Sequence, residues 1–379
     1  MQNEQVISTE VEKEKIASDV SCISSVSISG EETSIAPGCI LGEEGPVILD
    51  NCRLGRNVRL KGGYFKDAVF LDHASMGAGA HVRAGTLLEE NASTAHTVGL
   101  KQTILFPFVT TGSLINFCDG FVSGGTDHIN HSEIGSSYVH FNYTPNQDKA
   151  TASLFGDVAR GVFLKERPIF LGGQGGAVGP IKVAFGSVIA AGTILRKDID
   201  IENQLVIEAS IKPTMRSYQP PKYTGLKRIL SNNISYIGNL FALHAWYQDV
   251  RLKTARDTFD ESVYLGAIQL IDQSVQERVM RLEGLYKRVV CSHENLQQLG
   301  LKEEEFQYQQ AFIERWKTLR EDLVKPSLEA PDRLTSAFSP KKEYIETIQA
   351  LSNEVQLVGA VWLNAIVKEI EDKLESLYE

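Results

Sequence analysis

Four histidines lie close together in the second quarter of the chain: His96, His128, His131 and His140, of 8 in a sequence of 379 residues. Imidazole exchanges protons near neutral pH, so a histidine in a cleft can act as a general base. Each one, taken alone, could equally be a hydrogen-bonded structural residue. For the group as a whole, we expect one functional member.

A period of six governs the part of the chain that must position these residues. Apolar residues recur at this spacing in three runs: Ile48, Leu54 and Leu60; Met76, Val82 and Leu88; Val183, Ile189 and Leu195. An α-helix would show apolar residues at i, i+3, i+4 and i+7, and an ordinary strand would alternate over a few residues and then turn. A short strand and a tight corner, repeated, explain a period of six, which is the hexapeptide signature of a parallel β-helix.

The same pattern divides the chain into three parts. Residues 1–33 are rich in Ser and Glu and are predicted to be a flexible N-terminal segment. Residues 34–212 hold most of the 31 glycines and are predicted to form the β-helix, with roughly eight to ten coils. Residues 213–379 follow a spacing of three and four, so we expect an all-α domain that packs, oligomerises or binds an unknown protein. The predicted fold class is therefore β + α.

Two cations match the length of one coil. Arg83 and Lys101 are 18 residues apart, and a coil with three six-residue sides takes about 18 residues. Their side chains would therefore stack on one face of the β-helix. The alternative interpretation is a pair of solvated surface charges.

Composition excludes several classes of protein. The formal net charge of −10 argues against a nucleic-acid binder, because phosphate contacts need clustered Lys and Arg. The five cysteines form no CxxC pair, so we expect neither a disulfide framework nor a zinc site. We expect no membrane span, because no run of 18 apolar residues exists. The polar N-terminus has no signal-peptide pattern, and a cytosolic protein is predicted.

The stretch from Met76 to Lys197 resembles the C-terminal acetyltransferase domain of the bifunctional bacterial UDP-N-acetylglucosamine pyrophosphorylase and glucosamine-1-phosphate acetyltransferase family. The segments that carry the resemblance are VRAG (82–85), LLE (87–89), VGLK (98–101), EIGSS (133–137) with the Asn-Tyr pair and Lys that follow, and GSVIAAGT (186–193). The resemblance implies a left-handed coil, acetyl-CoA as acyl donor, a sugar nucleotide or amino-sugar phosphate as substrate, and a homotrimer with its sites between subunits.

The resemblance also implies roles for particular residues. In the family, the residues that match Arg83 and Lys101 hold phosphates, for which the planar guanidinium fork is suited. The other matched positions are Asn142 and Tyr143 around the sugar, Lys149 near the sugar phosphate, Ser113 and Asn116 in the substrate site, and Ser137, Ala190 and Arg196 on the acetyl-CoA side.

The chain departs from the family pattern at the general base. The family has a histidine where this chain has Ser113 and a tyrosine where it has Asn116. Serine cannot act as a base near pH 7 without a partner. Either catalysis is lost, or a nearby histidine supplies the base, and the candidates are His128, His131, His140 and, in the adjoining turn, His96. His140 would share a strand face with Asn142, two residues further on.

A second departure concerns the family's other activity. Only about 33 residues precede the predicted β-helix, and they contain no Gly-rich phosphate loop. The glycine-rich segment 172–180 lacks the Gly-Lys-Ser/Thr ending of a P-loop. Uridylyl transfer by this chain is therefore not expected.

Two other functions fit parts of the pattern. A non-catalytic sugar-nucleotide binder or scaffold would keep the two cations and dispense with the base. A trimeric zinc enzyme of the carbonic-anhydrase type would use three histidines, for instance His81, His128 and His131. The His-x4-His spacing typical of such a site is absent, so no metal is predicted.

Overall fold

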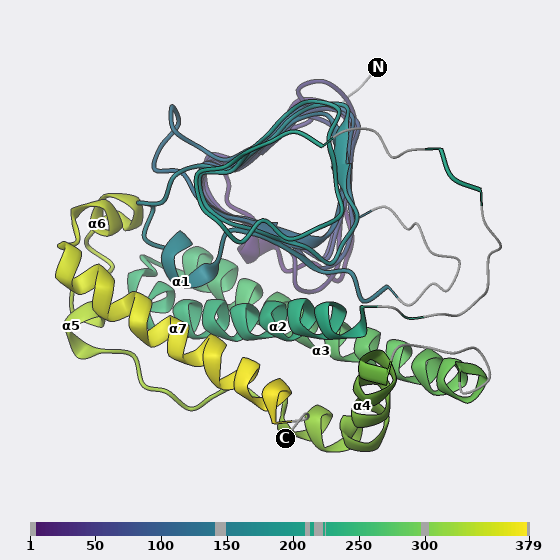
Figure 1. The fold of residues 1–379 in the computed structure, drawn as a ribbon. Helices are drawn as coiled ribbons and strands as arrows, with labels where there is room; N and C mark the ends of the chain where they lie inside the picture. Colours follow the sequence, from purple (N-terminus) through teal and green to yellow (C-terminus); the bar gives the residue numbers. More distant parts are fainter. Residues whose placement is uncertain are drawn as a thin grey trace.

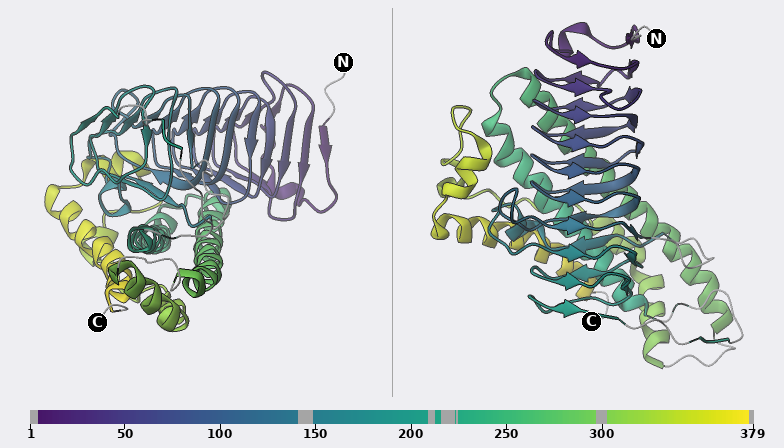
Figure 2. Two further views of the ribbon diagram at one scale, coloured as in Figure 1. Left: turned by 45° about the vertical axis from the view of Figure 1, so that its right-hand side comes forward. Right: turned by 90° about the horizontal axis from the view of Figure 1, so that it is seen from above.

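A β-helix and a group of C-terminal helices make up the molecule (Figure 1). The computed structural model describes residues 5–140, 149–208, 213–215, 223, 225–296 and 303–376. The predicted fold class is confirmed: a left-handed parallel β-helix is followed by an all-α region. Seen along its axis the β-helix is a triangular prism, and the helices lie against one of its sides. Figure 2 shows the coils stacked along this axis.

Each coil contributes short strands to three sides of the prism. Side 1 consists of β1 (Gln5–Ile7), β3 (Val26–Ser29), β6 (Val47–Asp50), β9 (Gly63–Lys66), β12 (Ala80–Val82), the first halves of β15 (Val98–Leu105) and β17 (Ile115–Val122), β19 (Ser137–Val139), β22 (Gly175–Ala177) and β25 (Ile194–Leu195). Side 2 consists of β4 (Ser34–Ile35), β7 (Arg53–Leu54), β10 (Ala68–Phe70), β13 (Thr86–Leu88), the second halves of β15 and β17, β20 (Ser153–Phe155) and β23 (Lys182–Val183).

Side 3 is a parallel sheet with ten strands among the described residues: β2 (Ser21–Cys22), β5 (Ile40–Leu41), β8 (Arg59–Leu60), β11 (Ser75–Met76), β14 (Ser93–Thr94), β16 (Thr110–Thr111), β18 (Glu133–Ile134), β21 (Phe170–Leu171), β24 (Val188–Ile189) and β26 (Leu205–Val206). The three edges of the prism are called edge 1–2, edge 2–3 and edge 3–1, after the sides that they join.

The hexapeptide markers fill the narrow core of the prism. Leu60 pairs with Leu41 in the preceding coil and with Met76 in the following one, and all three side chains are fully buried. Stacking identical positions lets each aliphatic side chain pack on those above and below it, which gives the period its physical meaning. One marker is wrong: Ile48 is 44% exposed, because the alternation in β6 turns Val47 and Leu49 inward instead.

The N-terminal boundary also needs correction. Residues 1–33 were expected to be a flexible segment, yet β1 pairs in parallel with β3, and β3 with β6. Val26 and Ile28 point into the core and are each 1% exposed, whereas the two serines of β3 alternate with them and point outward. The abundant Ser conceals an ordinary alternation, so the described β-helix begins at Gln5. The predicted boundary at residue 212 lies outside the described residues.

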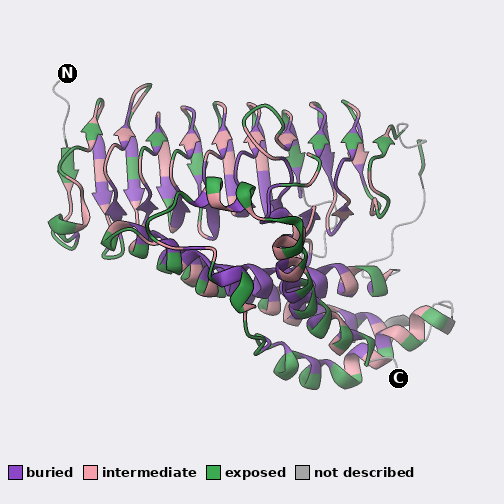
Figure 3. Ribbon diagram, turned by 90° about the vertical axis from the view of Figure 1, so that its left-hand side faces the viewer, coloured by how far each residue is buried: buried purple, intermediate pink, exposed green. Residues whose placement is uncertain are grey.

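The helices are α2 (Leu226–Asp249), η2 (Arg251–Thr254), α3 (Thr258–Leu296), α4 (Glu303–Asp322), α5 (Asp332–Thr335), α6 (Tyr344–Ala350) and α7 (Asn353–Glu375), with η1 (Lys13–Lys15) and α1 (Val158–Gly161) in loops of the β-helix. Helix α2 packs between α3 and α7 and contacts β20, while α3 crosses β4, β7, β10 and β13 of side 2. Figure 3 shows buried residues along α2, between the coils and the outer helices.

Among the described residues, no single helix is long and apolar enough to span a membrane. Helices α6 and α7 reach the required length and hydropathy only as a pair, across a bend of 106°.

Buried hydrogen bonds and ion pairs stabilise the packing of the helices on side 2. The Tyr247 hydroxyl on α2 donates to Glu89 Oε1 at 2.5 Å, and Arg251 forms an ion pair with Glu90. On α3, Arg278 pairs with Asp119 of β17 at 2.8 Å. Because buried charges are costly unless they are paired, these contacts fix how the helices sit on the coils.

Candidate functional site

The two predicted cations stack along edge 1–2. Val82 pairs with Leu100 in the next coil, and Lys101 pairs with Cys118 in the one after. Phe117 pairs with Val139, so the residue that follows Val139 takes the same position again. The described residues that occupy this position from β3 to β25, which we call the edge column, are Ser29, Asp50, Lys66, Arg83, Lys101, Cys118, His140, Val178 and Arg196. The stacking predicted from the 18-residue spacing is confirmed.

His140 is the histidine that the fold brings to these cations. It is 7% exposed, with its Nε2 3.1 Å from Asp119 Oδ2 and 2.8 Å from Thr151 Oγ1. The Thr151 hydroxyl also lies 3.2 Å from the Lys149 carbonyl oxygen, to which it can donate. The second ring nitrogen, Nδ1, is buried and has no hydrogen-bond partner in the described part of the chain.

Asp119 lies at the corner within β17 and contacts His140 of the following coil. Its Oδ1 accepts a hydrogen bond from Arg278 Nη2 at 2.8 Å, and Arg278 is 1% exposed. Burial by itself would raise the pKa of this carboxyl, but the charge of Arg278 and the hydrogen bond from His140 outweigh it and lower the pKa to about 2. Asp119 is thus an ionised hydrogen-bond acceptor at neutral pH.

Ser113 lies at a different edge, edge 3–1, but it is not isolated. Thr94 pairs with Thr111, so His96 and Ser113 occupy the same position in successive coils. The distance from Ser113 Oγ to His96 Nδ1 is 2.9 Å, and His96 is exposed. A coil that lacks the family's histidine therefore has an imidazole directly beside it, supplied by the preceding coil.

Small residues follow edge 3–1 beyond Ser113. Gly112, Gly135, Gly172 and Ala190 take one position in four successive coils, because the strands before them pair in register. A Cβ at Gly135 or Gly172 would lie 2.7 or 2.4 Å from the backbone of the next coil, so these glycines let successive coils pack closely.

Asn116 lies on the open face between the two edges. It pairs with Gly99 and Tyr138 in side 1, is half-buried, and its Oδ1 is 3.7 Å from Cys118 Sγ. Ser137 was predicted to lie on the acetyl-CoA side of the site. This prediction is wrong, because the side chain is 1% exposed and points into the coil. The alternation of β19 turns Tyr138 outward instead.

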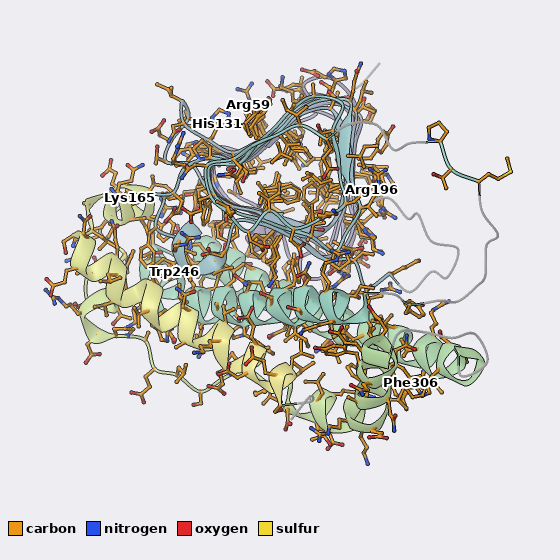
Figure 4. All side chains as sticks on the ribbon, in the orientation of Figure 1. Arg59, His131, Lys165, Arg196, Trp246 and Phe306 are labelled. Carbon is orange, nitrogen blue, oxygen red and sulfur yellow. The ribbon has the colours of Figure 1, made fainter. Side chains whose placement is uncertain are left out.

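The structure separates the predicted catalytic histidines. His128 and His131 lie at edge 2–3, in the loop between β17 and β18, where the His128 ring meets Phe108 edge-on at 4.9 Å. Figure 4 labels His131 and Arg196 on opposite flanks of the prism. His128 and His131 therefore do not belong to the edge column of their own chain. The residues between them and His140 carry the chain from edge 2–3 around to edge 1–2.

The histidines named for the zinc alternative lie apart from one another within one chain. His81 lies on side 1, where its ring stacks on Tyr64 at 5.4 Å. His128 and His131 lie at edge 2–3, and the described residues contain no group of three or more potential metal ligands.

Two predicted substrate residues, Asn142 and Tyr143, lie outside the described residues. Lys149 is half-buried, two residues before Thr151, and so adjoins His140. The sequence analysis missed Asp119 and Arg278. For Asp119 the residue type was the local signal. The corner there has a left-handed conformation with φ of 53°, which Asp tolerates better than most residues. Arg278 is 159 residues away and had no local signal.

Comparison with known proteins agrees with the fold. No family model matches the chain. It is 28% identical over 196 residues to a protein named bifunctional protein GlmU from Geotalea uraniireducens, a match that covers 52% of this chain and 38% of that protein. The GlmU of Pelobacter propionicus is 29% identical over 174 residues, and that of Thermotoga petrophila is 22% identical over 167 residues.

The β-helix of this chain is GlmU-like. The resemblance predicted from the sequence is confirmed over 44–52% of the chain. The matches cover 33–38% of the length of these GlmU relatives, so the chain shares about a third of each.

Proposed function

We propose that this chain is an acyltransferase of the hexapeptide-repeat kind, which transfers an acetyl group from acetyl-CoA to a sugar nucleotide or an amino-sugar phosphate. The similarity to GlmU and the β-helix support the general assignment. The observation that carries the proposal is the edge column, where His140 and its carboxylate partner Asp119 lie beside Lys101 and Arg83.

Each part of the edge column has a chemical task in this proposal. Arg83 and Lys101 bind the substrate phosphates, since two stacked cations match two negatively charged groups. His140 removes a proton from the attacking amine or hydroxyl as that group adds to the thioester carbonyl. The C–S bond then breaks, and CoA leaves as the thiol.

Acetyl-CoA is assigned to edge 3–1 and its surroundings. Ala190, half-buried at this edge, is assigned to the pantetheine arm, and Arg196, which lies across side 1 at edge 1–2, is assigned to a CoA phosphate. Sides 1 and 3 face away from the helices in Figure 1, and we propose that they meet neighbouring copies in a homotrimer with its sites between subunits. The donor would place the reaction in the cytosol.

His96 is the second candidate for the base. It is favoured by its hydrogen bond to Ser113, which stands where the GlmU-like pattern has a histidine. The variants His140→Gln and His96→Gln distinguish the two: the base is the histidine whose loss abolishes acetyl transfer while substrate binding persists.

A non-catalytic role is the alternative function. In that case the edge column binds a sugar nucleotide without turnover, and the helices recruit an unknown protein. The departure at Ser113 is the observation that favours this alternative.

Calorimetric titration tests the proposal. The protein is titrated with acetyl-CoA, with and without UDP-N-acetylglucosamine, and then with the sugar nucleotide alone. Arg83→Ala and Lys101→Ala should each weaken binding of the sugar nucleotide roughly tenfold or more, because a charge-assisted hydrogen bond contributes about 1.5–3 kcal/mol. Arg59→Ala on side 3 is the matched control and should bind normally, since Arg59 is exposed and pairs with Glu43.

Saturable binding of acetyl-CoA, near one site per chain, supports the acyltransferase. Binding of the sugar nucleotide without acetyl-CoA favours the scaffold. Unchanged affinity in both cation variants overturns the assignment of the phosphate site.

A further inference from the structure

The helices and the edge column share one buried hydrogen-bonded chain. Arg278 of α3 donates from Nη2 to Asp119 Oδ1 at 2.8 Å, and Asp119 Oδ2 lies 3.1 Å from His140 Nε2. Their relative exposures are 1%, 9% and 7%, so water competes little for these bonds. These hydrogen bonds thus join helix α3, the corner within β17 and the residue that follows β19.

We infer that Arg278 is a positioning residue of the site: by occupying one oxygen of Asp119, it leaves the other oxygen to fix the tautomer of His140 and makes the helices part of the catalytic unit. This inference rests on the proposed function, in which His140 is the base.

The donors and acceptors around His140 determine the tautomer of its ring. An ionised carboxylate only accepts hydrogen bonds, so the His140 nitrogen that faces it must carry the hydrogen. That nitrogen is Nε2, and Thr151 Oγ1 can accept from it as well, because the Thr151 hydroxyl donates to the Lys149 carbonyl. Nδ1 is then the bare nitrogen of the neutral ring. In the proposed reaction Nδ1 receives the proton of the acceptor, and because this atom is buried, the ring has to be uncovered when the acceptor binds.

Other charged or titratable groups lie near the hydrogen-bonded residues Arg278, Asp119 and His140. From α3, Glu277 lies 3.9 Å from Arg278 but is bonded to Arg281. From β15, Lys101 adds positive charge near Asp119. From α2, Tyr236 lies near Arg278 and Asp119, and burial raises its pKa, so it remains uncharged.

The helix-borne cation has a specific consequence for an Asp119→Asn variant. The amide would present its oxygen to Arg278, which can only donate. The amide NH2 would then face His140, and Nε2 would have to accept. The ring would switch to the tautomer with hydrogen on Nδ1, so that the proposed base atom is blocked.

The experiment records side-chain ¹⁵N NMR spectra of the full chain at a pH where the ring is neutral, with His140→Gln to assign the signal. A ring nitrogen that carries hydrogen and one that does not have clearly different shifts, so the tautomer is read directly. We expect hydrogen on Nε2 in the wild type and on Nδ1 in Asp119→Asn. In the double variant Asp119→Asn/Arg278→Met the amide is free to turn, and hydrogen should return to Nε2.

The double variant also guards against misfolding, because it removes both charges of the buried pair together. The inference is overturned if Asp119→Asn keeps hydrogen on Nε2, or if the double variant gives the same tautomer as Asp119→Asn. The readout needs no substrate. The expected tautomers together with an absence of acetyl transfer would support the link to the helices and reject the proposed function, whereas turnover with an unchanged tautomer would do the reverse.

Discussion

Replacing Glu89 by Gln tests how the helices are held on the β-helix. Glu89 follows β13 on side 2 and accepts a hydrogen bond from the Tyr247 hydroxyl at 2.5 Å. It is 4% exposed. Burial raises its pKa to about 7, with a further contribution from Glu90, against the opposing charge of Arg251 and the hydrogen bond from Tyr247.

The magnitude follows from this shift. An unfolded chain ionises Glu89 near 4.5, whereas the folded protein ionises it near 7. Its contribution to the free energy of unfolding is therefore fully present below pH 4.5 and lost as the pH rises through 7. At about 1.36 kcal/mol per pKa unit, the loss is about 3 kcal/mol. Glutamine keeps the oxygen that accepts from Tyr247 and cannot ionise.

The assay is urea unfolding at pH 5 and pH 8, followed by tryptophan fluorescence. The chain has 3 tryptophans, Trp246, Trp316 and Trp362, which lie on α2, α4 and α7 and so report on the helices. Relative to wild type, Glu89→Gln should gain about 2.5 kcal/mol more at pH 8 than at pH 5, since part of the effect is already lost at pH 5. Glu375→Gln, exposed at the end of α7, is the control and should show no such change.

Comparing the variant with wild type at each pH cancels the other titrating groups that both proteins share. An equal stability difference at pH 5 and pH 8 would refute the reasoning, because it would mean that Glu89 keeps one ionisation state across this range.

Three other predictions concern stability and thiol chemistry. Because the folded pKa of Asp119 is about 2, the stability it contributes is present above pH 3.8 and is lost toward pH 2; acid unfolding of Asp119→Asn should lack this component, about 2 kcal/mol in urea titrations. Gly359→Ala should destabilise α7 by about 1–3 kcal/mol, since a Cβ there would lie 2.5 Å from the Phe163 ring, whereas Gly284→Ala on α3 meets nothing within 4 Å and should stabilise by roughly 0.5–1 kcal/mol; urea unfolding measures both. Cys39, fully buried with its pKa raised to about 12, should react with a thiol reagent at pH 8 only after unfolding, as quantified by mass spectrometry of labelled peptides.

The repeat made much of the β-helix predictable from the sequence. In a solenoid each coil contacts only its neighbours, so spacing along the chain translates directly into stacking in space. Arg83 and Lys101 share a position in successive coils for this reason. The same logic missed the first coils, because serines at outward positions of β3 hid the inward pair Val26 and Ile28.

The candidate site was predictable only in part, because its histidines depend on the exact length of each coil. The coil from Cys118 to His140 contains the loop with His128 and His131 on its way around the prism. That loop places His131 at edge 2–3 and brings His140 back to edge 1–2, beside the cations. Proximity in sequence thus suggested a group of histidines that the fold distributes over three edges.

The sequence by itself determined the local, repeating features: the period of six, the inward apolar positions, the stacked cations and the change to helical spacing. These depend on interactions between a residue and its counterpart one coil away. Only the tertiary structure decided that Arg278 reaches Asp119, because that contact spans 159 residues and arises when α3 packs across side 2. A buried cation has to find its counter-charge wherever packing places one, and no local pattern in the sequence records that choice.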